Sequence, residues 1–248
     1  MSASPDLRIS PDRATLFRAA ADEFASKALA AVRARGRFTL ALAGGSTPKS
    51  LYSLLATNSS LPWEKTFFFF GDERHVPPDD PESNYRMARE ALLSKIPVPA
   101  ENVFRVPAEN PDASRAAAAY EQTLREFFRP AEGAFPQFDL ILLGMGPDGH
   151  AASLFPESKA LQEKSRWVVA NWVEKFKTHR ITLTLPVLNN AAVVMFLVSG
   201  SDKASALAEV LQGQQPGELF PSKLVRPSDG DLIWMVDQAA AAQLSKSP

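Results

Sequence analysis

The chain contains 248 residues, of which 45% are hydrophobic and 22% are charged, so it can bury a full core as one large domain or two small ones. Its net charge of −1 argues against a nucleic-acid-binding protein, which usually shows a basic face or tail. The absence of cysteine excludes disulfides and thiolate metal sites, and neither a signal-peptide pattern nor a membrane-spanning apolar run is visible. We therefore expect a cytoplasmic protein without a membrane segment or a structural metal.

Helices and strands are expected to alternate along the first half of the chain. Ser10 and Pro11 are typical of the N-cap and first position of a helix. Apolar residues then recur at helical spacing, and Gly36 is expected to end this helix. The segments that follow are a strand over 37–45, a helix over 47–56, a strand over 66–73, a helix over 83–96 and a short strand over 102–106.

The second half continues this alternation. It predicts a helix over 111–128, strands over 138–146, 166–173, 179–185 and 192–200, a helix over 201–212, and a last strand and helix over 231–244. Strands of nearly continuous apolar residues between helices indicate an α/β, Rossmann-like fold, with a mostly parallel β-sheet covered by helices on both faces. Ligands of such sheets bind at the carboxyl ends of the strands, and four segments there have unusual chemistry.

The first of these segments is AGGSTPKSL. Gly44 and Gly45 permit close backbone approach, and Ser46 and Thr47 precede a helix. The free amides of a first helical turn, together with the helix dipole, favour an anion. The segment lacks the G-x-x-x-x-G-K-[ST] pattern of nucleoside triphosphatases, so a monophosphate is the expected ligand, with an ordinary capped glycine turn as the alternative.

The second segment, FFFFGDERHVP, places four polar residues directly after a strand of phenylalanines. Asp72, Glu73, Arg74 and His75 cannot all point inward, because successive side chains of a strand alternate between its faces. Either the cluster is a solvated loop with local ion pairs, or an acid or arginine from it faces a ligand.

The third segment, LILLGMGPDGHAASL (residues 140–154), matches G-x-G-x-x-G after a strand. A dinucleotide site is not expected, because Pro156 leaves no room for the long helix that such a site requires, and no acidic residue closes a second strand about 20 positions later. What remains is Asp148 and His150 held by glycines. A histidine can remove a proton from water and return it to a leaving group, and Asp148 is expected to orient the imidazole.

The fourth segment is a pair of cations. Arg180 lies in the strand HRITLTL, and Lys203 is expected in the first turn of the helix SDKASALAEVLQ. A lysine at that position opposes the helix dipole, which suggests that an anion binds there, although surface lysines are common. His179 alternates to the other face of its strand and is expected to be structural.

Five segments, in order along nearly the whole chain, resemble the 6-phosphogluconolactonase family, which is related to glucosamine-6-phosphate deaminase. These segments are LAGGSTP, FFGDERHVPPDDPESNYRMARE, FDLILLGMGPDGHAASLFP, RITLTLPVLNNA and FLVSGSDKASAL. The resemblance implies a single α/β domain over residues 1–248 that hydrolyses a sugar-phosphate lactone in the pentose phosphate pathway. It also implies that no metal or organic cofactor takes part.

The resemblance implies a role for each candidate residue. It implies that His150 is the catalytic base that activates water, with Asp72 and Arg74 lining the same site. It further implies a phosphate grip made by Gly45, Ser46, Thr47, Arg180 and Lys203. The residues leave open whether Arg74 or backbone amides of the glycine loops stabilise the oxyanion, and they do not determine the oligomeric state.

Two other functions are alternatives. An amino-sugar phosphate isomerase of the related family resembles GHIAFNEP, with a catalytic glutamate, where this chain has GHAASLFP and Glu157 lies just beyond that position. Ala151 departs from the usual lactonase pattern, in which a threonine is common. A sugar-phosphate sensor without catalysis would be expected to lose the acid and the base, and this chain keeps both.

Overall fold

The computed structural model describes residues 5–245, and its central element is a six-stranded parallel sheet. Its strands are β1 (Asp6–Ser10), β2 (Phe38–Leu42), β3 (Thr66–Phe70), β5 (Leu140–Leu143), β8 (Val193–Val198) and β9 (Asp231–Asp237). They pair in the order β1-β9-β8-β5-β2-β3, and every pairing is parallel. The inner strands β2, β5 and β8 are buried along their whole length, as expected for a sheet covered on both faces. The predicted α/β fold with a mostly parallel sheet is confirmed.

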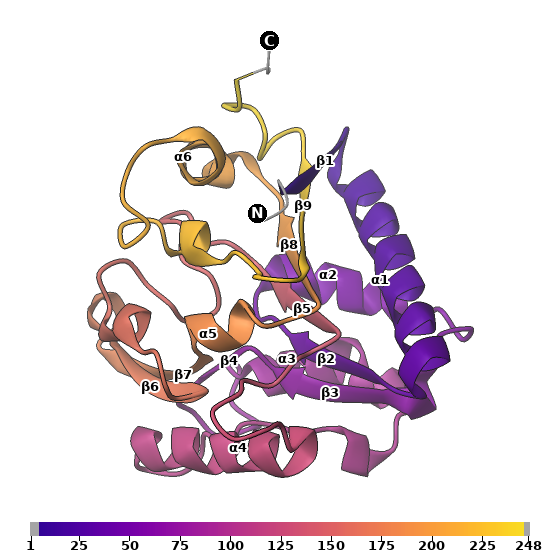
Figure 1. Cartoon of the computed structure of the whole chain (residues 1–248). Coiled ribbons are helices and arrows are strands. Elements are labelled where there is room, and N and C mark those ends of the chain that lie inside the picture. Colours follow the sequence, from indigo (N-terminus) through magenta and orange to yellow (C-terminus); the bar gives the residue numbers. More distant parts are fainter. Residues whose placement is uncertain (1–4, 246–248) are drawn as a thin grey trace.

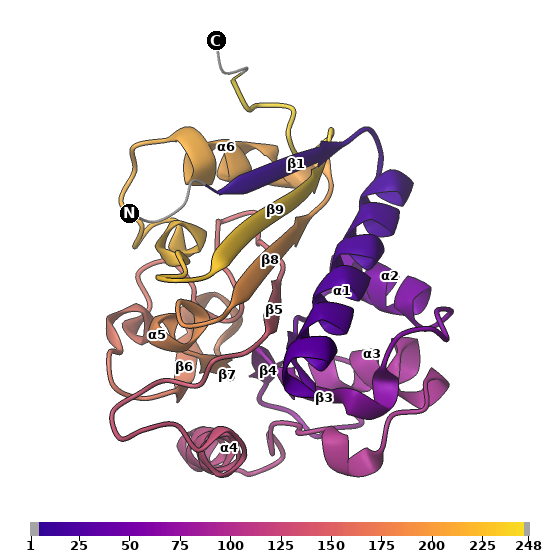
Figure 2. The ribbon, with the colours of Figure 1, turned by 45° about the vertical axis from the view of Figure 1, so that its right-hand side comes forward.

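Helices flank this sheet on both sides (Figures 1 and 2). Helices α1 (Arg13–Arg35) and α2 (Ser46–Leu55) lie on one side, and α4 (Ala113–Phe128) and α6 (Ala204–Gln212) lie on the other. The chain moves across the sheet in one direction from β1 to β3 and returns from β3 to β9. Because crossovers between parallel strands are right-handed, the two directions place their helices on opposite faces.

A second, smaller sheet lies beside the first one. It consists of β4 (Asp72–Arg74), β6 (Val168–Val173) and β7 (Thr178–Leu183), which pair antiparallel in the order β4-β7-β6. The sequence predicted a single strand over 66–73 and no separate antiparallel sheet, and this was wrong. The chain changes sheets at Gly71, whose amide donates to Leu42 of β2 and whose carbonyl accepts from Leu183 of β7.

The N-terminal helix begins later than the sequence predicted. Its N-cap is Asp12, whose carboxylate accepts from the Thr15 amide at 2.7 Å, whereas Ser10 belongs to β1, a strand that was not predicted. The end of the helix is confirmed, because Gly36 adopts a left-handed φ of 71° and closes it. The Asp12 cap therefore starts the helix two residues after Ser10, the cap that the sequence predicted.

Two predicted elements are absent as such. Residues 102–106 form only a single β-bridge, between Val103 and Phe68, and no ladder of hydrogen bonds. The Phe104 ring, stacked on Phe69, anchors this segment instead. Residues 238–243 form turns, because so short a helix is marginal without further packing. Within residues 5–245, no helix combines the length and hydropathy needed to cross a bilayer.

Two buried tyrosines hold the ends of neighbouring strands. The Tyr52 hydroxyl, on α2, accepts from the Ala43 amide at 2.9 Å and donates to the Ala43 carbonyl at 2.8 Å. The Tyr120 hydroxyl, on α4, makes the same pair of bonds with Phe70 at 2.8 and 3.1 Å. Each such pair of bonds, a tyrosine clasp, satisfies the amide and the carbonyl of one residue at the point where a functional segment begins.

Replacing either tyrosine by phenylalanine leaves a buried amide and carbonyl without a partner. We expect Tyr52→Phe and Tyr120→Phe each to lower the free energy of unfolding by about 1–3 kcal/mol in a urea titration. Tyr85→Phe is the control, because its ring packs on Phe70 while its hydroxyl has no hydrogen bond to any residue of the described range 5–245. Wild-type stability of both clasp variants would contradict this role.

Candidate functional site

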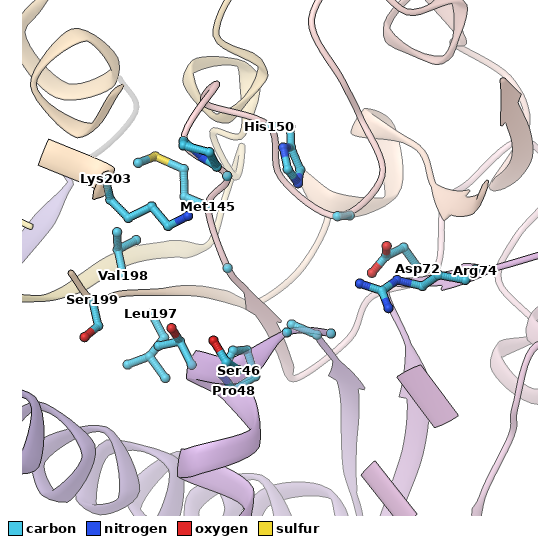
Figure 3. Close-up of a pocket in the computed structure, with 18 residues that line it drawn as sticks. Ser46, Pro48, Asp72, Arg74, Met145, His150, Leu197, Val198, Ser199 and Lys203 are labelled. Carbon is cyan, nitrogen blue, oxygen red and sulfur yellow. The ribbon is translucent and has the colours of Figure 1, made fainter. Parts of the chain in front are cut away.

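A cavity of about 240 Å³ opens at the carboxyl edge of the parallel sheet, where the loops after β2, β5 and β8 face strand β4 (Figure 3). Most of the residues singled out from the sequence line it, namely Gly44, Gly45, Ser46, Thr47, Asp72, Arg74, His150 and Lys203. Asp148 and Arg180 do not line it. The strand-end segments, far apart in the sequence, therefore surround a single space, as the parallel topology requires.

One end of the cavity has the features of an anion site. Gly45 is the N-cap of α2 with a φ of 100°, and the first helical bond runs from Lys49 to its carbonyl. The amides of Ser46 and Thr47 precede that bond, so the helix itself offers them no acceptor. Lys203 lines the same end. These donors, the helix dipole and an ammonium group together favour a phosphate.

Lys203 is not placed on a regular helical turn. It ends a 3-10 turn, Ser201–Lys203, and is the N-cap of α6. Its ammonium group lies 3.0 Å from the Asp202 carboxylate, which is largely exposed. Figure 3 shows the Lys203 side chain reaching toward the middle of the cavity, between Met145 and Val198. The sequence predicted Lys203 in the first turn of the helix, whereas it lies directly before α6. The residue nevertheless lines the cavity.

The loop after β5 holds a histidine–carboxylate pair. His150 Nδ1 lies 2.5 Å from Asp148 Oδ1, and the imidazole stacks on Phe155 with ring centroids 4.2 Å apart. Gly146 is required beside the pair, because a Cβ there would lie 2.0 Å from His150 Nδ1. Asp148 thus sits behind the ring, and Nε2 is the nitrogen that remains available to the cavity.

The ionisation of Asp148 determines the tautomer of this histidine. Burial acts to raise the pKa of Asp148, but the hydrogen bond and charge of His150, with the ammonium of Lys175 at 3.5 Å, outweigh it. The pKa of Asp148 is consequently held well below its usual range, so the carboxylate is ionised at neutral pH. An ionised carboxylate can only accept a hydrogen bond, so Nδ1 carries the proton and Nε2 presents a lone pair.

Arg74 lines the opposite wall of the cavity, and Arg180 is paired with it outside the lining. Arg74 of β4 and Arg180 of β7 are directly paired across the small sheet, and Arg74 donates to the Glu82 carbonyl. Burial lowers the pKa of the Arg180 guanidinium, and the neighbouring charge of Arg74 lowers it further. Two of the Arg180 nitrogens, Nε and Nη1, are buried without a hydrogen-bond partner among residues 5–245. The positive charge of Arg74, with that of Arg180 beside it, favours an anionic or polarised group at this wall.

This position differs from the one expected for Arg180. The sequence grouped Arg180 with Lys203 in a phosphate grip, but in the structure it is paired with Arg74 across the small sheet and does not line the cavity. Sequence alone could not show this, because it depends on the pairing of β4 with β7.

The DERH cluster divides as strand alternation requires. Asp72 and Arg74 face the cavity. Glu73 faces helix α3 (Asn84–Ala91), where its carboxylate accepts from the amides of Asn84 and Tyr85 at 2.7 and 2.8 Å. His75 bonds the Asn110 carbonyl and does not line the cavity.

Two residues that hold Asp72 were not singled out from the sequence. Ser153 and Asn84 donate to its carboxylate and lie within quoted motifs, but neither follows a pattern that predicts this contact. His179, expected to be structural, packs against Trp172 outside the cavity. Within residues 5–245, no group of three His, Asp or Glu side chains is arranged to hold a metal ion.

Comparisons with known proteins show to which family the chain is similar. The family model described as glucosamine-6-phosphate isomerases/6-phosphogluconolactonase matches residues 11–234. A 6-phosphogluconolactonase from Nostoc sp. is 44% identical over 239 residues, covering 96% of this chain and 98% of the relative. One from Mycobacterium tuberculosis is 39% identical over 247 residues, covering 97% and 99%. The solved 6-phosphogluconolactonase from Trypanosoma cruzi has a TM-score of 0.88 at 34% identity and covers 99% of both chains.

The anion site predicts that inorganic phosphate binds beside Ser46 and Lys203. Because a hydrogen bond to a charged group contributes about 1.5–3 kcal/mol, we expect Lys203→Ala to weaken phosphate binding at least roughly tenfold in titration calorimetry. Lys164→Ala is the control, because Lys164 is exposed and lies outside the cavity. The same phosphate affinity in the wild type and Lys203→Ala would show that the Lys203 ammonium takes no part in phosphate binding.

Proposed function

The chain belongs to the family of glucosamine-6-phosphate isomerases and 6-phosphogluconolactonases, and from this premise we propose that it hydrolyses 6-phospho-D-glucono-1,5-lactone to 6-phospho-D-gluconate, a step of the oxidative pentose phosphate pathway. The observation that carries the proposal is the pairing of His150 with an ionised Asp148 at a cavity whose far end suits a phosphate. A base for water and an anchor for the substrate thus lie in the same space.

The phosphate binds at the N-terminus of α2, with the amides of Ser46 and Thr47 and the ammonium of Lys203 as donors. Gly44 and Gly45 carry no side chain there and allow the backbone to approach the phosphate oxygens. Holding this remote group fixes the sugar ring relative to His150. Binding energy gained at the phosphate then assists the reaction at C1.

Hydrolysis proceeds by general-base catalysis. His150 Nε2 removes a proton from water while the water oxygen attacks the C1 carbonyl, and a tetrahedral oxyanion forms. The bond from C1 to the ring oxygen then breaks, and the imidazolium returns the proton to that oxygen. Asp148 holds Nδ1–H throughout and stabilises the imidazolium. These reaction steps require only water, a base and hydrogen-bond donors, so neither a metal nor an organic cofactor is needed.

Arg74 is the group best placed to stabilise the oxyanion. The competing donors would be amides of the glycine loop, but the Gly146 amide donates to the His150 carbonyl and the Gly149 amide to the Gly146 carbonyl. Arg74 faces the cavity, and Arg180 behind it adds a second positive charge. This wall also suits the carboxylate that the reaction produces.

Deamination of an amino sugar fits the cavity less well. Asp72 is the only carboxylate among the described residues that line it, and Glu157 is exposed and lines a neighbouring cavity. Ala151 stands where a threonine is common in lactonases. It is fully buried and does not line the cavity, so the absence of a threonine hydroxyl at this position does not change the cavity lining. We place the reaction in the cytoplasm, with residues 1–248 as one catalytic domain, and the net charge of −1 supports a small-molecule substrate over nucleic acid.

Removing the base tests the reaction. General acid–base catalysis typically contributes about 10²–10⁴-fold, so we expect His150→Ala to lower kcat by that factor. Proton release from freshly prepared 6-phosphogluconolactone is followed, and the spontaneous rate is subtracted. Glucono-1,5-lactone without phosphate is the matched substrate and should react far more slowly with the wild type. Wild-type turnover by His150→Ala would rule out this mechanism.

Gly146→Ala tests the geometry of the pair without removing a functional group. Its Cβ would meet Nδ1 and Cε1 of His150 at 2.0 and 2.1 Å and Asp148 Oδ1 at 2.6 Å, so the imidazole must move. A displacement of about 1 Å can cost about 100-fold in rate, and we expect a loss of that order in kcat. Gly71→Ala is the control, because its Cβ would make only an ordinary contact at 3.5 Å. Equal rates for the two variants would contradict the requirement for glycine.

A further inference from the structure

The carboxylate of Asp72 is held at both of its oxygens. Ser153 Oγ donates to Oδ2 at 2.6 Å, and Asn84 Nδ2 lies 3.3 Å from Oδ1 while donating to the Asp72 carbonyl at 2.9 Å. All three side chains are buried, so water does not compete for these bonds. An ionised carboxylate has about four acceptor positions, and the two partners use only one on each oxygen. Because Asp72 lines the cavity, the remaining positions are available to a sugar hydroxyl.

Ser153 is itself fixed by the small sheet. Its amide donates to Thr182 Oγ1 of β7 at 3.3 Å, and its carbonyl accepts from Asn171 Nδ2 of β6 at 2.9 Å. It lies three positions after His150 in the same loop. The hydroxyl of Ser153 therefore connects the loop of the base to the strand that carries Asp72.

Asn84 makes the second connection. It is the first residue of α3, and its amide donates to Glu73 Oε1 at 2.7 Å. Its side chain lies against Gly44 in the loop that precedes α2, where a Cβ would come within 2.1 Å of Asn84 Oδ1. Asn84 thus fills the space next to the phosphate loop and holds Asp72 from that side.

We propose that Ser153 and Asn84 are positioning residues that clamp Asp72 at a set place on the β4 side of the cavity, with Asn84 linking it to the phosphate loop and Ser153 linking it to the loop of His150. The inference rests on the proposed function. The clamp makes the Asp72 carboxylate a rigid acceptor for a hydroxyl of the lactone ring, so that the C1 carbonyl faces the water held by His150. Without the Ser153 hydroxyl, the carboxylate is free to turn about its side-chain bonds, and the ring loses this point of alignment.

The variants Ser153→Ala and Asn84→Ala test the clamp against matched controls. Ser222→Ala removes a hydroxyl that is equally buried, 1% against 2% exposed, and that has no hydrogen-bond partner among residues 5–245. Asn102→Ala removes a buried amide that donates to the Glu64 carbonyl, far from the cavity. For each protein, kcat and KM for the lactone, the Kd for inorganic phosphate and the Tm are measured.

We expect Ser153→Ala to lower kcat roughly 10- to 100-fold, with the phosphate Kd unchanged because other residues bind that group. Its Tm should lie a few degrees below that of Ser222→Ala, because Asp72 loses a buried donor, and the loss of kcat at an unchanged phosphate Kd is the readout that a merely structural role would not produce. Since Ser153 acts through Asp72, the double variant Asp72→Asn/Ser153→Ala should be no slower than Asp72→Asn alone. Asn84→Ala should show the same pattern relative to Asn102→Ala.

Three outcomes would overturn the clamp while leaving the lactonase function intact. These are a kcat of Ser153→Ala within about twofold of its control, a parallel loss of phosphate affinity, and losses that multiply in the double variant. Absence of lactone hydrolysis by the wild type is a separate result, which would remove the proposed function and the clamp together.

Discussion

The passage of the chain from one sheet to the other at Gly71 is the constraint on which the site depends. The amide of this residue belongs to the parallel sheet and its carbonyl to the antiparallel one. The next residues, Asp72 and Arg74, are therefore turned toward the loops that follow β2, β5 and β8. Parallel strands alone would place all functional segments along one edge. The small sheet adds a wall opposite that edge, and the edge becomes a cavity.

The charges around this cavity match the course of the reaction. In the proposed binding mode, a dianionic phosphate lies at the helix terminus near Lys203, while the reacting end of the substrate begins as a neutral ester and finishes as a carboxylate. In that proposal Arg74 faces the reacting end, where negative charge appears only in the transition state and the product, and Arg180 is its partner across the small sheet. Donors aimed at developing charge stabilise the transition state more than the substrate.

Features with a local physical cause could be predicted from sequence. Apolar runs identified the buried strands, Gly36 identified a helix end, and AGGSTP identified a helix terminus suited to anions. Features set by distant pairing could not be predicted. The position of Arg180 follows from its register with Arg74, and the bond between Asp72 and Ser153 joins residues 81 positions apart. No periodicity or motif encodes such a contact, because it exists only after two sheets have packed.

The long separation between Asp72 and Ser153 also has a consequence for folding. Helix α2 and its glycine loop are adjacent in sequence to β2, but Lys203 comes from the loop after β8, so the complete phosphate site also requires contacts between distant segments. The wall that carries Asp72 requires β4 to pair with β7, and loop closure over such distances slows folding. Both halves of the cavity therefore depend on contacts between distant segments, so we expect a partly folded chain to lack phosphate binding and catalysis together.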